Sequence, residues 1–290
     1  VISYALENGK LKPAELGPVI IAGRHELTGI PCAITEWMEY DGAHSCKVEF
    51  EGDWIYGSLV MPDKDNLSAA KKVVRFICSE EKLIVIGDNN DGREIVERLL
   101  TVKHGFSSIG DAFLTMLERL IYEDIFSIYK IEEKLQKLEA VVLLGAEKDI
   151  NKAILSLSRQ LQVLHSYYEQ LVAMGERIED EEFFSEERQL HTFIDKSRRL
   201  DTKVYTLLDY CKQIRESFRA EIDMRMNRVM KTLTVITTLF MPVTVVSAWY
   251  GMNFRGMPEL SSPFGYWIVT GVTLLFTVSA IVFCRYKKLL

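Results

Sequence analysis

One face of the apolar segment that ends near residue 250 carries a row of side chains that are polar, flexible or small. None of them is charged. At about 100° per residue, these positions of a helix fall within an arc of about 100°. They are Asn227, Met230, Thr234, Thr237, Met241, Thr244 and Ala248. Threonine hydroxyls in a membrane helix either face water or donate hydrogen bonds within and between helices. Three threonines on one line favour a face that lines a water-filled pore, with helix packing as the alternative.

Two apolar segments long enough to cross a bilayer are needed to position this face. Residues 232–249 and 264–284 contain no charged side chain, and a bilayer needs about 20 helical residues. The short linker between them predicts a helical hairpin. Pro242 lies inside the first span and removes the helix hydrogen bond to the carbonyl of Thr238, so we expect a bend or a hydrated carbonyl there. Two buried core helices are the alternative.

Charged and aromatic residues around the two spans predict their orientation. Basic residues mark the cytoplasmic ends of membrane helices, and Trp and Tyr gather at the interfaces. The basic residues before the first span and after the second are Arg225, Arg228, Lys231, Arg285, Lys287 and Lys288. We therefore expect both termini in the cytoplasm, the loop 251–263 outside and a basic cytoplasmic tail at 285–290. The aromatic residues at the outer interface are Trp249, Tyr250, Tyr266 and Trp267.

The chain ahead of the hairpin divides into three parts by its pattern of apolar residues. Residues 1–105 mix short β-like runs with helical segments and predict a cytoplasmic α/β domain. Residues 106–185 show helical periodicity and predict antiparallel helices. From 186 to 250 no Gly or Pro occurs before Pro242, which predicts one stalk helix, about 95 Å long, that continues into the first span at about residue 232. The predicted fold is an α+β membrane protein.

Several shorter elements are predicted within these parts. Strands are expected at 18–22, 32–35, 46–50, 54–56, 59–60, 73–77 and 83–86. Short helices are expected at 66–72 and 92–104. A helix from about 148 to 174 is expected to end at Gly175, because glycine commonly follows the last helical residue.

The composition excludes several classes of protein. With 48% apolar and 26% charged residues, the 290-residue chain is not disordered. Its net charge of −6 disfavours nucleic acid as a partner. The five cysteines are scattered without a CxxC pair, so neither a disulfide framework nor a zinc site is expected. No paired catalytic residues and no nucleotide-binding loop are found, and we expect neither an enzyme nor an organic cofactor.

The motif that follows the first span carries a family resemblance. Tyr250-Gly-Met-Asn-Phe254 is followed by Met257-Pro-Glu-Leu260, two spans surround them, and a short basic tail ends the chain. This arrangement resembles the CorA family of magnesium channels. The resemblance is closest over residues 227–290 and covers the rest of the chain in the order of its parts.

The resemblance implies a funnel-shaped homopentamer in the plasma (inner) membrane that passes Mg²⁺, together with Co²⁺ or Ni²⁺. Gly251, Met252 and Asn253 would form the selectivity filter. Magnesium loses its water shell reluctantly, so a filter that leaves the shell in place needs hydrogen-bond acceptors around it. Five Asn253 amide oxygens would form such a neutral ring. A ring of carboxylates would hold a divalent ion more tightly and slow its exit.

The resemblance also implies roles for residues along the stalk. It places Asn227, Met230, Leu233, Met241 and Thr244 where the family's pore-lining residues lie, and most of them coincide with the row described above. Met230 and Leu233 would form an apolar constriction, with helix packing as the alternative. Cytoplasmic Mg²⁺ bound between subunits would hold the pore closed. Thr192 stands where a relative has an acidic sensor residue, and Asp195 is the substitute candidate.

Other functions remain open on the sequence. A zinc transporter of the ZntB branch would keep the fold, but that branch resembles a Gly-x-Asn form of the motif, and the intact Met252 argues against it. A non-conducting, membrane-tethered helical scaffold would direct the threonine row toward helices or lipid. It would also tolerate any residue at Asn253.

Overall fold

The computed structural model describes most of the chain. The described residues are 2–7, 10–14, 17–22, 30–39, 44–64, 66–67, 69–87, 91–100, 105–143, 149–185, 187–252, 257 and 262–286. The chain forms two compact units, Val1–Arg215 and Glu216–Leu290. Asn253 and the basic residues Lys287 and Lys288 lie outside the described residues.

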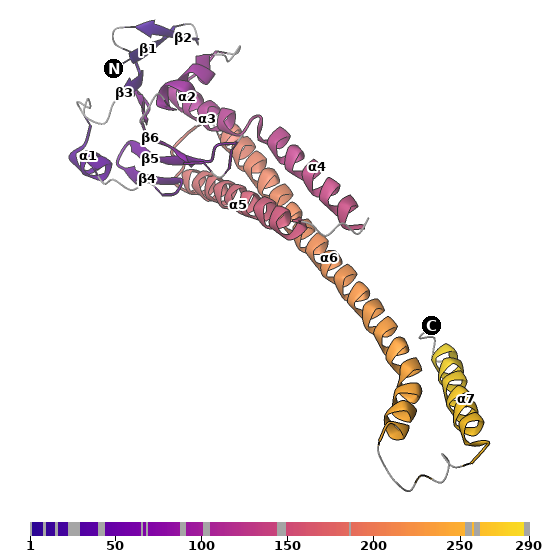
Figure 1. Ribbon diagram of the computed structural model, residues 1–290. Helices are drawn as coiled ribbons and strands as arrows, with labels where there is room; N and C mark the ends of the chain where they lie inside the picture. The colour runs from indigo at the N-terminus through magenta and orange to yellow at the C-terminus, as the bar shows by residue number, and fades with distance from the viewer. Residues whose placement is uncertain are drawn as a thin grey trace. The chain divides into compact units, whose positions relative to one another are not determined.

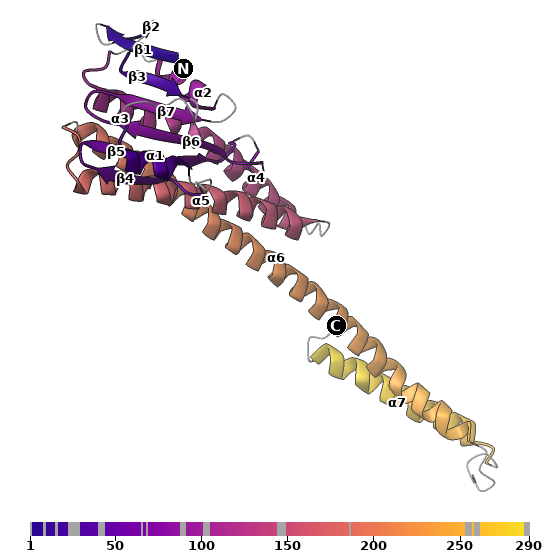
Figure 2. The ribbon, with the colours of Figure 1, turned by 90° about the vertical axis from the view of Figure 1, so that its left-hand side faces the viewer.

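A mixed seven-stranded sheet is the framework of the first unit (Figures 1 and 2). Its order is β2-β1-β3-β7-β6-β5-β4. β3 and β7 are parallel, and the other neighbouring strands are antiparallel. The strands are β1 (Ile2–Glu7), β2 (Lys10–Ala14), β3 (Val19–Ala22), β4 (Lys47–Glu51), β5 (Trp54–Met61), β6 (Lys72–Cys78) and β7 (Leu83–Gly87).

The central strands are buried on both faces, as their continuous apolar sequences require. On one face, Ile77 joins a buried cluster with Tyr56 and with Ile34 of the helix α1 (Cys32–Glu39). On the other face, the ring of Phe76 lies 4.9 Å from that of Phe113. Phe113 belongs to the helix α3 (Ile109–Leu120). The core therefore forms on both sides of β6.

Long helices follow the sheet. After α2 (Asp91–Leu100) and α3 come α4 (Asp124–Leu143), α5 (Ile150–Asp180), α6 (Glu187–Tyr250) and α7 (Gly265–Tyr286). The 64-residue α6 continues without interruption through Pro242, as the sequence predicts. At 1.5 Å per residue it is about 96 Å long. The predicted fold class, a sheet domain followed by long helices and two C-terminal apolar helices, is confirmed (Figure 1).

Both apolar helices are exposed in the single chain. The apolar windows of α6 and α7 have mean hydropathies of 1.7 and 2.2, and 6% of each window is buried. A core helix of a soluble protein would be mostly buried. The exposure therefore excludes the alternative of two buried core helices and fits helices that face lipid or other subunits.

Two of the predicted short elements are wrong, and two others form a single strand. Residues 32–35 lie in α1 rather than in a strand, and the amides of Ile34 and Thr35 donate to the carbonyl of Pro31 at 3.1 and 3.2 Å. A four-residue apolar run is compatible with either structure, because it is too short to show a period. The described residues of the predicted helix at 66–72 belong to the β5–β6 connection, except Lys72, which begins β6. The two predicted strands at 54–56 and 59–60 are both part of β5.

Gly175 does not end a helix, because α5 continues to Asp180. This glycine is buried against α6, where a Cβ atom would lie 2.6 Å from Cγ1 of Ile194. Gly175 therefore allows a close approach of two helices, a role that a single sequence does not distinguish from helix termination.

Candidate functional site

The predicted row of residues on α6 lies exposed in the single chain. Met230, Leu233 and Met241 are 54%, 55% and 63% exposed. The remaining members are exposed as well: Asn227, Thr234, Thr237, Thr244 and Ala248. We call these eight residues the stripe. The stripe contains no charged residue.

The second apolar helix covers a different face of α6. Val235 is 7% exposed, and Leu239, Pro242 and Val246 on the same side are partly buried. A cavity between the two helices is lined by Val246 and Ser247 of α6 and by Val269 and Thr273 of α7, among others. At 100° per residue, the centre of this covered face is about 150° from the centre of the stripe. α7 therefore leaves the stripe uncovered.

The stripe threonines donate to their own helix and keep their oxygens exposed. Thr234, Thr237 and Thr244 donate to the carbonyls of Met230, Leu233 and Phe240 at 2.8, 2.9 and 2.9 Å. This is the local bonding that the sequence left open as an alternative to facing water. The two uses are compatible, because a hydroxyl that donates its hydrogen still has lone pairs to accept. The stripe thus presents acceptors, which suit the outward-pointing hydrogens of a hydrated cation.

The predicted filter motif begins where α6 ends. The amide of Gly251 donates to the carbonyl of Ser247 at 2.9 Å, and the amide of Met252 donates to that of Trp249 at 3.3 Å. A Cβ atom at position 251 would lie 3.0 Å from the carbonyl oxygen of Ser247. Glycine therefore allows the last turn of α6 to close tightly. Asn253, two residues further on, lies outside the described residues.

A family model described as "CorA-like Mg2+ transporter protein" matches residues 26–288. The chain belongs to this family. Among its relatives, the cobalt/magnesium transport protein CorA of Thermotoga maritima is 28% identical over 259 residues, which cover 83% of this chain and 72% of that protein. The Bacillus subtilis protein YfjQ is 26% identical over 182 residues, 59% of this chain, and the match spans 55% of YfjQ.

Solved structures share the fold. The CorA magnesium transporter of Methanocaldococcus jannaschii superimposes with a TM-score of 0.73 at 16% identity, over 98% of this chain and 96% of that one. The cytoplasmic domain of ZntB from Vibrio parahaemolyticus gives a TM-score of 0.62 at 14% identity, over 77% of this chain and 98% of that one. At these identities the likeness concerns the fold alone, so the CorA fold does not by itself decide which ion is carried.

In this CorA-family chain, polar contacts join α6 to the helices around it. Lys203 lies 2.8 Å from Glu132 of α4, and Lys196 pairs with Glu118 of α3. Tyr210 donates to Glu139, and burial together with this carboxylate raises the pKa of Tyr210 to about 12. The sequence alone did not predict these contacts, although the seven-residue spacing of 196, 203 and 210 indicates one face of α6.

Asp195, the candidate for a regulatory metal ligand, is an exposed residue of α6. Its side chain is 64% exposed and lies 3.9 Å from Nη1 of Arg198. Thr192, one turn earlier, donates to the carbonyl of Arg188 at 2.8 Å. Within the described part of the chain, no group of three or more His, Cys, Asp or Glu residues could hold a metal ion. The regulatory role of Asp195 stays a prediction that needs ligands from another subunit.

Proposed function

We propose that the chain is one subunit of a homopentameric channel that conducts Mg²⁺, and also Co²⁺ or Ni²⁺, down its electrochemical gradient. The observation that carries this proposal is the uncharged stripe, which α7 leaves uncovered on a span of a CorA-family chain. One helix cannot enclose a pore, so several copies must surround an axis. Stripes from neighbouring copies would then face one another across that axis.

The selectivity of the proposed pore rests on acceptors that do not strip the ion. Rings of Asn253 amide oxygens at the outer mouth would bind the water shell of Mg²⁺. The oxygens of Thr244, Thr237 and Thr234 would accept further hydrogen bonds along the way. Because these groups are neutral, the divalent ion would not be held so tightly that it fails to leave.

The apolar end of the stripe is the proposed gate. Met230 and Leu233 are more than half exposed in the single chain, and rings of these side chains would exclude water when they approach one another. A gate is needed because two positive charges that cross 100 mV gain about 4.6 kcal/mol. We place the release of the gate under the control of cytoplasmic Mg²⁺ bound by carboxylates between subunits, with Asp195 as one candidate.

The proposed topology has both termini in the cytoplasm. Arg225, Arg228 and Lys231 precede the apolar window of α6, and Arg285 ends that of α7. These positions favour the cytoplasmic side for the ends of the hairpin. The motif at 251–253 would then meet the ion from outside, and the apolar end of the stripe would meet the cytoplasm.

Ion influx into proteoliposomes that contain a magnesium-sensitive dye tests this function. We expect wild-type protein to admit Mg²⁺ down its gradient and Asn253→Ala to lose flux or selectivity. A parallel experiment offers Zn²⁺ with and without a pH gradient. Zinc uptake that follows the proton gradient, without Mg²⁺ flux, would place the chain with the zinc transporters. Wild-type protein that conducts neither ion, even without internal Mg²⁺, would favour the scaffold.

A further inference from the structure

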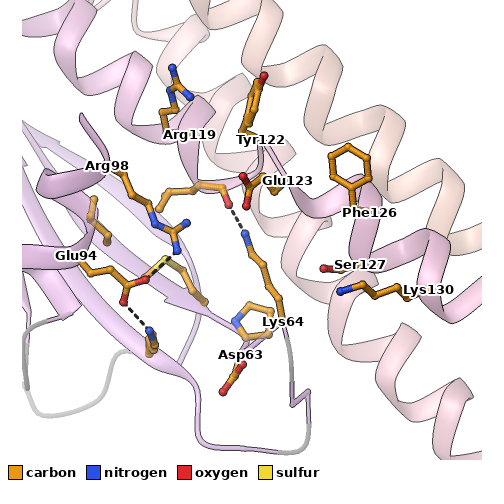
Figure 3. A pocket seen from close by; sticks show the side chains of 15 residues that line it. Asp63, Lys64, Glu94, Arg98, Arg119, Tyr122, Glu123, Phe126, Ser127 and Lys130 are labelled. Atoms are coloured by element: carbon orange, nitrogen blue, oxygen red, sulfur yellow. Dashed lines mark hydrogen bonds and ion pairs between the residues drawn. The ribbon is translucent and has the colours of Figure 1, made fainter. Parts of the chain in front are cut away.

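Two adjoining cavities lie in the first unit, among the β5–β6 connection and the helices α2, α3, α4 and α5. Their volumes are about 530 and 250 Å³. Lys64, Ser127 and Lys130 line both of them, and Figure 3 shows these three side chains close together at the larger one. Small-molecule sites commonly occupy about 300–1,000 Å³, so the two cavities together have the size of a ligand site.

The smaller cavity has an excess of positive charge. Lys64, Lys130 and Lys134 line it together with polar and apolar residues, and no carboxylate of the described residues does. The Lys64 ammonium is already engaged with the buried Asp124 and with the carbonyl of Leu120. Lys130 and Lys134, one turn apart on α4, make no ion pair with any residue that the structure describes. Two such like charges on one side of a helix repel each other until an anion neutralises them.

The carboxylates of α4 are engaged elsewhere. Glu133 pairs with Lys137 at 2.7 Å, Glu132 pairs with Lys203 of α6, and Glu139 accepts from Tyr210 of α6. The acidic residues of α4 therefore do not compensate the two lysines. The field in the smaller cavity favours a ligand with several negative charges.

The larger cavity adds exposed aromatic rings to this charge. Tyr122 and Phe126 are 60% and 64% exposed, and the guanidinium of Arg119 lies 5.1 Å from the centre of the Tyr122 ring. Exposed aromatic rings beside cations provide a surface on which a nucleic acid base stacks.

Carboxylates also line the larger cavity, and whether they are paired with cations affects which ligand the cavity can bind. Glu94 accepts from Lys72 and from Arg98 at 2.8 Å each (Figure 3). Asp63 and Glu123 are the other carboxylates of the lining. Glu94 is thus already paired with two cations, and a Mg²⁺ ion that accompanies a triphosphate keeps several of its waters and binds phosphate oxygens.

We propose that the two cavities form a binding site for a nucleotide triphosphate with its Mg²⁺ ion. The phosphate chain lies in the smaller cavity against Lys130 and Lys134, with Ser127 as a hydrogen-bond donor. The base stacks on Tyr122 or Phe126 at the larger one. This site is separate from the stripe and uses none of its residues, so its failure would leave the proposed conduction untouched.

Binding of Mg·ATP and of inorganic triphosphate to the purified full chain, measured by calorimetry, tests the site. We expect wild-type protein to bind both, and Lys130→Ala/Lys134→Ala to weaken both by about tenfold or more, because charge-assisted hydrogen bonds are lost. The matched control is Lys152→Ala/Lys212→Ala, which removes two exposed lysines that pair with Asp149 and Asp209 and line neither cavity. The control should bind like wild type. Thermal unfolding checks that both double variants are folded.

A second variant keeps the test decisive if the double variant does not fold. Gln160→Glu places a carboxylate in the lining of the smaller cavity and should weaken both probes. Tighter binding of Mg·ATP than of triphosphate supports the aromatic platform, and equal binding overturns that part. No binding of either probe to wild type, or an equal loss in the control, overturns the site as a whole.

Discussion

Gly251 is the residue at which the end of α6 depends most closely on the absence of a side chain. Because a Cβ atom there would lie 3.0 Å from the carbonyl oxygen of Ser247, Gly251→Ala requires the last turn of α6 to give by a few tenths of an ångström. We expect Mg²⁺ influx to fall by about tenfold, since misplacing a positioned group by a fraction of an ångström to an ångström has effects of this size. Membrane insertion should be unchanged.

Gly271→Ala in α7 is the matched control, because nothing lies within 4 Å of its added Cβ atom. It should leave influx as in wild type. If Gly251→Ala also conducts normally, the tight turn at the end of α6 does not position the filter.

Asp111 is the residue whose protonation matters most for the junction of α3 and α6. Burial raises the pKa of Asp111, but four hydrogen bonds to the carboxylate lower it by more than burial raises it. The pKa therefore lies below its ordinary value. Its carboxylate accepts from the amide and hydroxyl of Ser107 at 2.7 and 2.9 Å, from Thr115 at 3.3 Å and from Gln189 of α6 at 2.8 Å.

A carboxyl group with a lowered folded-state pKa stabilises the protein above its ordinary pKa of about 3.9, and this contribution is lost as the pH falls through the folded-state pKa. Asp111→Asn should therefore lower the unfolding temperature at pH 7, and the difference from wild type should shrink toward pH 3. Thermal unfolding across this range is the measurement. Asp209→Asn, which removes an exposed carboxylate from α6, serves as the control for the loss of one acidic side chain.

At the scale of elements, the contact of α5 with α6 depends on Gly175. The added Cβ of Gly175→Val would lie 2.6 Å from Cγ1 of Ile194, and overpacking of this kind costs about 1–3 kcal/mol. We expect Gly175→Val to lower the free energy of unfolding by that amount. Combining it with Ile194→Ala should recover part of the loss, because the smaller residue makes room. Additive effects in a double-mutant cycle would show that the two residues do not constrain each other.

The long elements could be predicted from the sequence, whereas the short ones and the packing could not. α6 has 64 residues, so its 3.6-residue period repeats many times. A pattern that repeats this often is incompatible with a strand or a loop. Residues 32–35 offer one period at most, and Pro31 decides their structure by accepting the first helical hydrogen bonds. The packing role of Gly175 could not be predicted from the sequence, because Ile194 is brought near it only by the tertiary fold.

The candidate site shows the same division. The stripe followed from a helical wheel, since a straight helix fixes which residues share a face. That α7 lies against Val246 rather than against the stripe depends on the tertiary packing of two apolar helices, which are alike in composition. The contacts of Lys196 and Lys203 could not be predicted from the sequence, because their partners lie more than 70 positions away in the chain.

For the whole molecule, the proposed assembly of several copies rests on membership of the CorA-like family and on a stripe that α7 leaves uncovered. An isolated copy would expose the oxygens of Thr234, Thr237 and Thr244 to lipid without any water to bind, which is unfavourable in a bilayer. Around a common axis the same groups face a hydrated ion. The central claim is therefore that water reaches the stripe and does not reach the neighbouring face of α6.

Thiol accessibility tests this claim most directly. In a Cys32→Ser background, which removes the exposed cysteine, Thr237→Cys and the adjacent Ile236→Cys are compared in dye-loaded proteoliposomes before and after a small cationic thiol reagent. Thiolates form and react where water reaches them. If the stripe lines the pore, the reagent blocks Mg²⁺ influx through Thr237→Cys and leaves Mg²⁺ influx through Ile236→Cys unchanged. Equal block at both positions, or influx that persists through a fully modified Thr237→Cys, would contradict it.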